Sequence, residues 1–120
     1  PEDAWNPKIS LDAEIDFNEI TGDLINIIET LAPFGAGNPE PKFCARGVRV
    51  SALRRVGAEG AHAKLQLTQC ERKLDAIAFR TGDNAPAEGT KIDIAFRPEY
   101  NEWRGQVSVQ LRIVDWHPAT

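Results

Sequence analysis

Few cysteines, no methionine and no long apolar run characterise this 120-residue sequence. The two cysteines, Cys44 and Cys70, stand in strand-like surroundings without a CxxC pair. This argues against metal or redox roles and favours two small buried residues in a reducing cytoplasm. No segment has the length and apolarity needed to cross a bilayer, and a signal-peptide pattern is absent. We therefore expect a cytoplasmic protein without membrane contact. Because it begins at Pro1, we also expect a piece of a longer chain.

Catalytic and metal-binding arrangements are also lacking. His62 and His117 are far apart in the sequence, without cysteines or paired carboxylates at ligand spacing nearby. Neither therefore resembles a metal ligand or a member of a catalytic triad. Asp12, Glu14 and Asp16 alternate along one stretch and could together hold a divalent ion, although a solvated acidic face is the simpler interpretation. We expect no catalytic residue and no cofactor in this chain.

What the sequence does contain is a division of charge. Residues 1–40 carry nine acidic side chains and one lysine, a net charge of −8. Residues 41–120 carry thirteen lysines and arginines against nine acidic residues, a net charge of +4, so the overall charge of −4 hides a basic C-terminal part. Such an asymmetry indicates a nucleic-acid or membrane contact in one half, or else two ordinary solvated surfaces.

Residues 1–40 read as an acidic extension with one strand and one helix. Apolar and polar residues alternate between positions 9 and 16, which predicts a short strand. Thr21 is a suitable helix cap and Pro33 ends the helix, which we expect at about residues 22–32. An apolar stripe at helical spacing predicts that one face is packed. Its members are Leu24, Ile27, Ile28 and Leu31.

The extension ends in the block PFGAGNPEP at residues 33–41. Gly35 and Gly37 permit a turn, and the prolines favour extended backbone beyond it. The GAG triplet is not a nucleotide-binding motif, because it follows a helix instead of a strand and no GK[ST] is present. We interpret the block as a structural elbow, with Phe34 as its apolar plug, that leads into a domain at residues 41–120.

The rest of the chain shows the period-two alternation of β-strands. A long first strand that can bend, and a loop between the third and fourth strands, predict a mainly β, five-stranded Greek-key barrel of the OB-fold type. The short strand and amphipathic helix precede it, and an SH3-like barrel is the alternative. The expected strands are residues 43–56, 61–70, 74–79, 92–96 and 107–113, with turns at 57–60 and 100–105.

Two turns of such a barrel border its ligand groove, and here both are rich in basic or aromatic residues. Aromatic faces stack on bases at about 1–3 kcal/mol each and guanidinium groups contact phosphates, a mixture typical of single-stranded nucleic-acid binders. Alternatively, Trp103 folds over its own hairpin and covers apolar surface. The candidate nucleic-acid-binding residues are Arg54, Arg55, His62, Lys64, Arg80, Arg97, Tyr100, Trp103 and Arg104.

Several blocks of the sequence resemble the C-terminal region of the RecJ family of single-stranded-DNA-specific exonucleases. They are LAPFGAGNPEP, GVRV, DAIAF and IAFRPEYNEWRGQVSVQLRIVDW, and the resemblance extends from about Leu11 to Pro118. In that family a PFGxGNPEPxF-like stretch joins the catalytic portion to an OB-fold domain that contains a NEWRG-like hairpin.

The resemblance implies a parent 5′→3′ exonuclease of DNA repair and recombination that uses Mn²⁺ or Mg²⁺ in a DHH-type core. The DHH and GGGH-like motifs of that core are not in this sequence. Phosphodiester hydrolysis needs metal-activated water, so we expect the chain to be catalytically silent. Its expected role is to hold single-stranded DNA beside the catalytic core, tolerantly of sequence and with strong salt dependence.

A role in another class also fits the sequence. The acidic extension and its helix suit a structural or protein-docking module that braces the catalytic core or recruits a partner such as single-stranded-DNA-binding protein. An unrelated OB-fold protein that binds RNA or sugars is a third interpretation.

Overall fold

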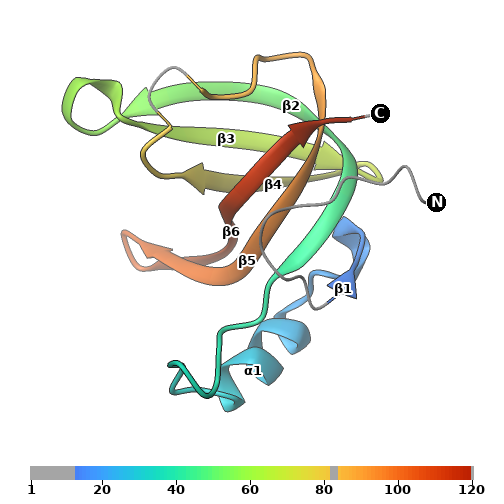
Figure 1. Cartoon of the computed structure of the whole chain (residues 1–120), viewed down its shortest axis with the longest axis vertical. Helices are drawn as coiled ribbons and strands as arrows, with labels where there is room; N and C mark the ends of the chain where they lie inside the picture. Colours follow the sequence, from blue (N-terminus) through green and yellow to red (C-terminus); the bar gives the residue numbers. More distant parts are fainter. Residues whose placement is uncertain (1–12, 82–83, 120) are drawn as a thin grey trace.

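A computed structural model describes residues 13–81 and 84–119, which form a closed β-barrel with one α-helix beside it (Figure 1). The barrel strands are β2 (Phe43–Val56), β3 (His62–Gln69), β4 (Arg72–Ala78), β5 (Lys91–Trp103) and β6 (Gln106–Pro118). Their order is β2-β3-β4-β6-β5, and β5 pairs with β2 to close the barrel. This order, with its parallel β4–β6 pair, confirms the predicted five-stranded OB-fold.

Within the barrel, β2 pairs with both β5 and β3, because it bends at a glycine bulge. Its first half pairs with β5 and its second half with β3. The register with β5 shifts between Ala45 and Val48, where Gly47 has φ +66°, a conformation that favours glycine. Asp93 stabilises this bulge, since its carboxylate accepts from the Gly47 amide at 2.8 Å and lies 3.5 Å from the guanidinium of Arg46.

Apolar residues that alternate along the strands fill the barrel interior. On β3, Leu65 and Leu67 are buried while Gln66 between them is exposed. Phe17 and Ile20, which precede the barrel in the chain, are fully buried in the same core. Other large members of the core are Phe43, Val48, Val50, Ile92, Ile94, Phe96 and Leu111.

Two short elements attach the N-terminal part to the barrel. β1 (Ala13–Glu14) pairs in parallel with the start of β2. The 3₁₀-helix η1 (Phe17–Glu19) begins with a capping box made by Asp16 and Glu19. The guanidinium of Arg72 on β4 donates to two backbone carbonyls at and just after η1. Of the strand expected at residues 9–16, only β1 is present among the described residues, and positions 9–12 lie outside them.

The helix α1 (Gly22–Thr30) begins at the predicted cap, because the Thr21 hydroxyl accepts from the Leu24 amide at 3.2 Å. The predicted stripe is wrong in part: Ile27 is 60% and Leu31 48% exposed, whereas Ile28 is buried. The short helix packs only a narrow face on the barrel, and Ile25 completes that face. Neither α1 nor any other described helix has the length and apolarity required to span a membrane.

Two further expectations are corrected by the structure. The turn expected at residues 100–105 contains only Arg104 and Gly105, because β5 continues to Trp103 in register with β6. Cys44 is buried as predicted, but Cys70 is exposed in the turn between β3 and β4, where its φ is +55°. A short turn of this kind lies outside the barrel wall, so its side chains remain in solvent.

Candidate nucleic-acid interface

The two turns that border the predicted groove lie on the same side of the barrel, at the left in Figure 1. One contains the 3₁₀-helix η2 (Ala58–Gly60) between β2 and β3, and the other joins β5 to β6. A groove of about 270 Å³ is lined by residues of all five barrel strands. It extends from Arg54 and Lys64, close to η2, to Asn101 on the β5–β6 hairpin. We refer to it as the barrel groove.

Arg54 and Lys64 form the cationic part of the barrel groove. They are register partners on β2 and β3, and both line the groove. Like charges directly opposite each other on neighbouring strands destabilise a sheet. Within residues 13–81 and 84–119, neither side chain forms an ion pair or a side-chain hydrogen bond. The pair therefore breaks a local rule of sheet stability, which is typical of functional positions.

The predicted residue Arg55 lies near the end of β2 and contacts the turn that contains η2. Its Nη1 donates to the Gly60 carbonyl at 3.3 Å. His62 packs closely against Gly57 in the same turn. A Cβ atom at Gly57 would lie 2.7 Å from the Cδ2 atom of His62. With φ +82° at Gly57, glycine is required there both for its conformation and for the approach of the imidazole.

Arg80 and His62 are joined at the end of β4. The Arg80 amide donates to Nδ1 of His62 at 2.9 Å, and the Phe79 ring meets the imidazole edge-on at 5.2 Å. The side chains of Phe79 and Arg80 are both exposed. The structure thus brings two of the predicted residues together beside η2 and adds an exposed aromatic ring that the sequence analysis did not single out.

Trp103 and Arg104 form the tip of the β5–β6 hairpin. Trp103 is 63% exposed, and the Arg104 guanidinium carbon lies 4.3 Å from the centroid of its ring. Arg104 and Gly105 both have positive φ, as a tight two-residue hairpin turn requires. The alternative of a tryptophan folded over its own hairpin does not fit this exposure, whereas a cation–π pair at a groove border does.

Tyr100 and Arg97, two other predicted residues, contact the N-terminal part of the chain. The Tyr100 hydroxyl lies 3.2 Å from both the Gly22 carbonyl and the Asn26 side-chain oxygen of α1. Arg97 Nε lies 3.7 Å from a carboxylate oxygen of Glu40 in the elbow. These contacts fit a role in attaching α1 and the elbow to the barrel.

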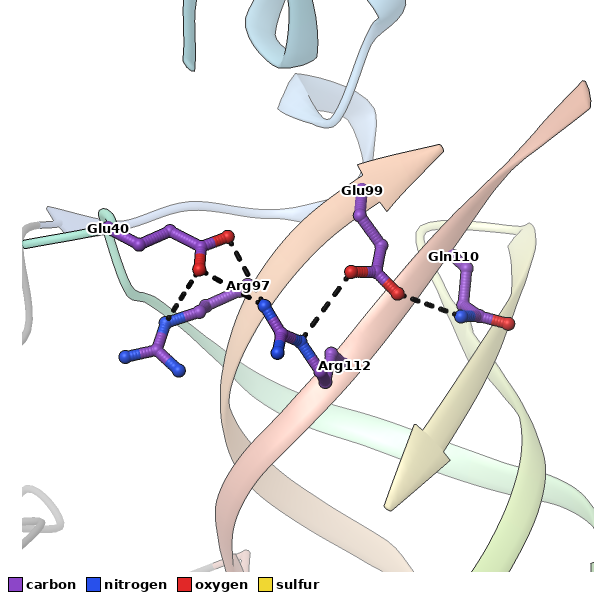
Figure 2. A network of polar contacts seen from close by, with 5 residues as sticks. All are labelled: Glu40, Arg97, Glu99, Gln110 and Arg112. Atoms are coloured by element: carbon purple, nitrogen blue, oxygen red, sulfur yellow. Dashed lines mark hydrogen bonds and ion pairs between the residues drawn. The ribbon is translucent and has the colours of Figure 1, made fainter. Parts of the chain in front are cut away.

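Glu40 joins Arg97 to Arg112 in the network shown in Figure 2. Its carboxylate accepts from Arg112 Nη2 at 3.1 Å and also pairs with Arg97. Arg112 Nε lies 3.5 Å from Glu99, whose other oxygen accepts from Gln110 Nε2 at 2.9 Å. The positive charges of Arg97 and Arg112 are therefore compensated by carboxylates, in contrast to those of Arg54 and Lys64.

Several polar residues that line the barrel groove were not predicted from the sequence. Gln66, Asp75 and Gln110 are successive register partners on β3, β4 and β6, and Asn101 of β5 lines the same groove. Gln66 and Asp75 are exposed and alternate with buried residues, which places them on the outer face of the barrel, whereas Gln110 is only 9% exposed. Alternation alone does not indicate which part of that outer face is concave.

The groups with shifted pKa values lie outside the groove, around β1. Burial raises the pKa of the Cys44 thiol. A hydrogen bond to Glu14, at 3.0 Å, raises the pKa of the Arg46 guanidinium. Of the three acidic residues considered as a divalent-ion site, Glu14 thus pairs with an arginine, Asp16 caps η1, and Asp12 lies outside the described residues. In the described parts of the chain, no three His, Cys, Asp or Glu side chains gather to hold a metal ion.

Comparison with known proteins is consistent with this geometry. The family of RecJ OB domains matches residues 11–115. The single-stranded-DNA-specific exonuclease RecJ of Bacillus subtilis is 28% identical over 116 residues, which cover 95% of this chain and 15% of that protein. The crystal structure of Thermus thermophilus RecJ with Mn²⁺ superposes with a TM-score of 0.64 at 28% identity, covering 81% of this chain and 14% of that one.

A more distant structure shares the fold alone. The second single-stranded-DNA-binding protein of Mycobacterium smegmatis superposes with a TM-score of 0.53 at 14% identity, over 64% of this chain and 84% of that one. The chain therefore spans about a seventh of the Bacillus protein that it matches.

Proposed function

Because this chain belongs to the family of RecJ OB domains, we propose that it binds single-stranded DNA in the barrel groove. The observation that carries the proposal is the pair of uncompensated cations, Arg54 and Lys64, side by side in a groove whose border carries the exposed ring of Trp103. A phosphate between the two cations relieves their mutual repulsion, and a base stacks on the tryptophan.

The predicted residues divide into two groups in this proposal. Arg104 on the hairpin, and Arg55 and Arg80 beside η2, supply further positive charge at the groove borders. Arg97 and Tyr100 act indirectly, since their contacts hold the elbow and α1 against the barrel. Binding of this kind uses backbone phosphates and ring faces, which all sequences offer, so it is salt-dependent and broadly tolerant of sequence.

In a longer protein of the RecJ type, the domain would hold single-stranded DNA beside a metal-dependent catalytic core. The proposed activity of that protein is 5′→3′ hydrolysis of single-stranded DNA in repair and recombination. The domain's part is to retain the strand while that core cleaves it.

Fluorescence anisotropy of a labelled oligo-dT tests the proposal. We expect binding in the micromolar range at low salt, weaker binding at moderate salt, and weaker binding of a duplex of the same length. No detectable binding at low salt, or equal affinity for duplex and single strand, would contradict the proposal.

A second candidate function is protein docking, either to the catalytic core or to a partner such as single-stranded-DNA-binding protein. The observation in its favour is the exposure of Ile27 and Leu31 on α1. NMR chemical-shift perturbation separates the two functions. Shifts at residues 54–64 and 100–104 on adding an oligonucleotide support DNA binding. Shifts confined to residues 24–31 on adding a partner peptide support docking.

A further inference from the structure

The two sides of the barrel groove carry different chemistry. Arg54 and Lys64 lie on β2 and β3, whereas Asp75 and Gln110 are register partners on β4 and β6. Asp75 is exposed and, as far as the structure describes the chain, makes no ion pair or side-chain hydrogen bond. One side of the groove therefore attracts phosphate and the other repels it.

Gln110 adds a second acceptor beside the Asp75 carboxylate. Its Nε2 donates to Glu99 at 2.9 Å, and Glu99 is itself held by Arg112. An ionised carboxylate only accepts hydrogen bonds, so the amide nitrogen must face Glu99. Figure 2 shows the Gln110 amide oxygen directed away from Glu99. A flipped amide would place its oxygen against the Glu99 carboxylate, so this orientation is favoured.

These acceptors determine how a strand can lie in the groove. Its phosphates stay near Arg54 and Lys64, because the carboxylate of Asp75 repels them. Its bases then extend across the groove toward β4 and β6. Cytosine and adenine present exocyclic amino groups there, whereas thymine and uracil present a carbonyl oxygen at the equivalent position.

We propose, on the basis of the proposed function, that Asp75 and Gln110 make the groove prefer cytosine and adenine over thymine and uracil. The amino group of cytosine donates to these acceptors, whereas the N3–H donor of uracil is flanked by two carbonyl oxygens that the acceptors repel. One hydrogen bond to a charged acceptor in a solvent-accessible groove corresponds to about a threefold to tenfold difference in affinity.

The sharpest comparison uses oligo-dC and oligo-dU of about 12 nucleotides, a length that one OB-fold can cover. The two differ only at the C4 substituent and the N3 position, so stacking and backbone charge are nearly matched. At low salt and slightly above neutral pH, we expect oligo-dC to bind about threefold to tenfold more tightly by fluorescence anisotropy.

The variant Asp75→Asn tests the assignment to this residue. Its amide can donate as well as accept and no longer repels, so we expect tighter binding of oligo-dU and a dC-to-dU affinity ratio near one. Glu29→Gln is the matched control, because it makes the same change of charge and shape at an exposed position of α1. We expect this control to keep the wild-type ratio.

The outcomes distinguish this inference from the proposed function. Equal, salt-dependent binding of oligo-dC and oligo-dU by the wild-type protein overturns the base preference and leaves the proposed function intact. An unchanged ratio in Asp75→Asn overturns the role of Asp75. Failure to bind either oligonucleotide at low salt overturns the proposed function, and this inference with it.

Discussion

Trp103 lies at the tip of the β5–β6 hairpin with most of its ring exposed and the Arg104 guanidinium close to it. A ring in this position contributes to binding without contributing to the core. We expect Trp103→Ala to weaken oligonucleotide binding by about 1–3 kcal/mol if one base stacks on the ring. The melting temperature should hardly change. Val107→Ala on the same hairpin, where the side chain is also exposed, is the control and should bind like wild type. Equal losses in both variants would contradict a specific role for the ring.

The two cysteines differ in their exposure to solvent. Cys44 is buried, and burial raises the pKa of its thiol, which lowers its thiolate fraction at any given pH. Cys70 is exposed in a turn. We expect one thiol to react rapidly with a chromogenic disulfide reagent in the native protein and two in denaturant. Cys70→Ser should abolish the rapid reaction. Rapid reaction of this variant would show that Cys44 is accessible.

At the level of the elements, the attachment of the elbow to the barrel depends on one carboxylate. Glu40 compensates Arg97 and Arg112, which are both partly buried. Glu40→Gln removes the carboxylate that pairs with Arg97 and leaves Arg112 paired with Glu99 alone. We therefore expect the free energy of unfolding to fall by about 1 kcal/mol, a value reduced by the partial exposure of these groups to solvent. Urea unfolding followed by circular dichroism measures this change. Glu29→Gln on α1 is the control, because Glu29 is exposed, and identical midpoints for the two variants would contradict the role of Glu40.

For the whole molecule, the charge distribution predicts that the affinity for single-stranded DNA depends on salt concentration. The net charge is −4, yet the groove carries Arg54 and Lys64 without carboxylate partners. Each phosphate contact to a single strand contributes a slope of about −0.7 to the logarithm of affinity against the logarithm of salt concentration. We expect Arg54→Gln and Lys64→Gln each to reduce the slope by about that amount in anisotropy titrations.

Lys91→Gln is the control for these titrations. Lys91 is exposed at the start of β5 and does not line the groove. The salt-dependence slope of the Lys91→Gln variant should equal that of the wild-type protein. If Lys91→Gln reduces the slope as much as the groove variants do, binding is spread over the whole surface and the groove assignment is wrong.

The predicted fold was largely correct because its signals are local. Alternation along residues 43–56 and 61–70 produced β2 and β3, and Thr21 marked the start of α1. The errors also have local causes. Strand residues of a hairpin near its turn are polar and resemble a loop, so the end of β5 at residues 97–103 was missed. The C-terminal end of β6, at residues 114–118, was also missed, and it pairs with the start of β5. The face of α1 that packs was misplaced, because a short amphipathic helix has more apolar residues than its narrow contact can bury.

By itself, the sequence determined the five strands, the barrel type and the presence of cations and aromatic rings near two turns, since periodicity and turn composition are properties of neighbouring residues. Only the tertiary structure decided which of these cations remain uncompensated. The turn that contains η2 sets the β2–β3 register that places Arg54 opposite Lys64, while the path of the elbow brings Glu40 to Arg97. Pairings between distant segments depend on register and chain path, and no single segment of the sequence carries that information.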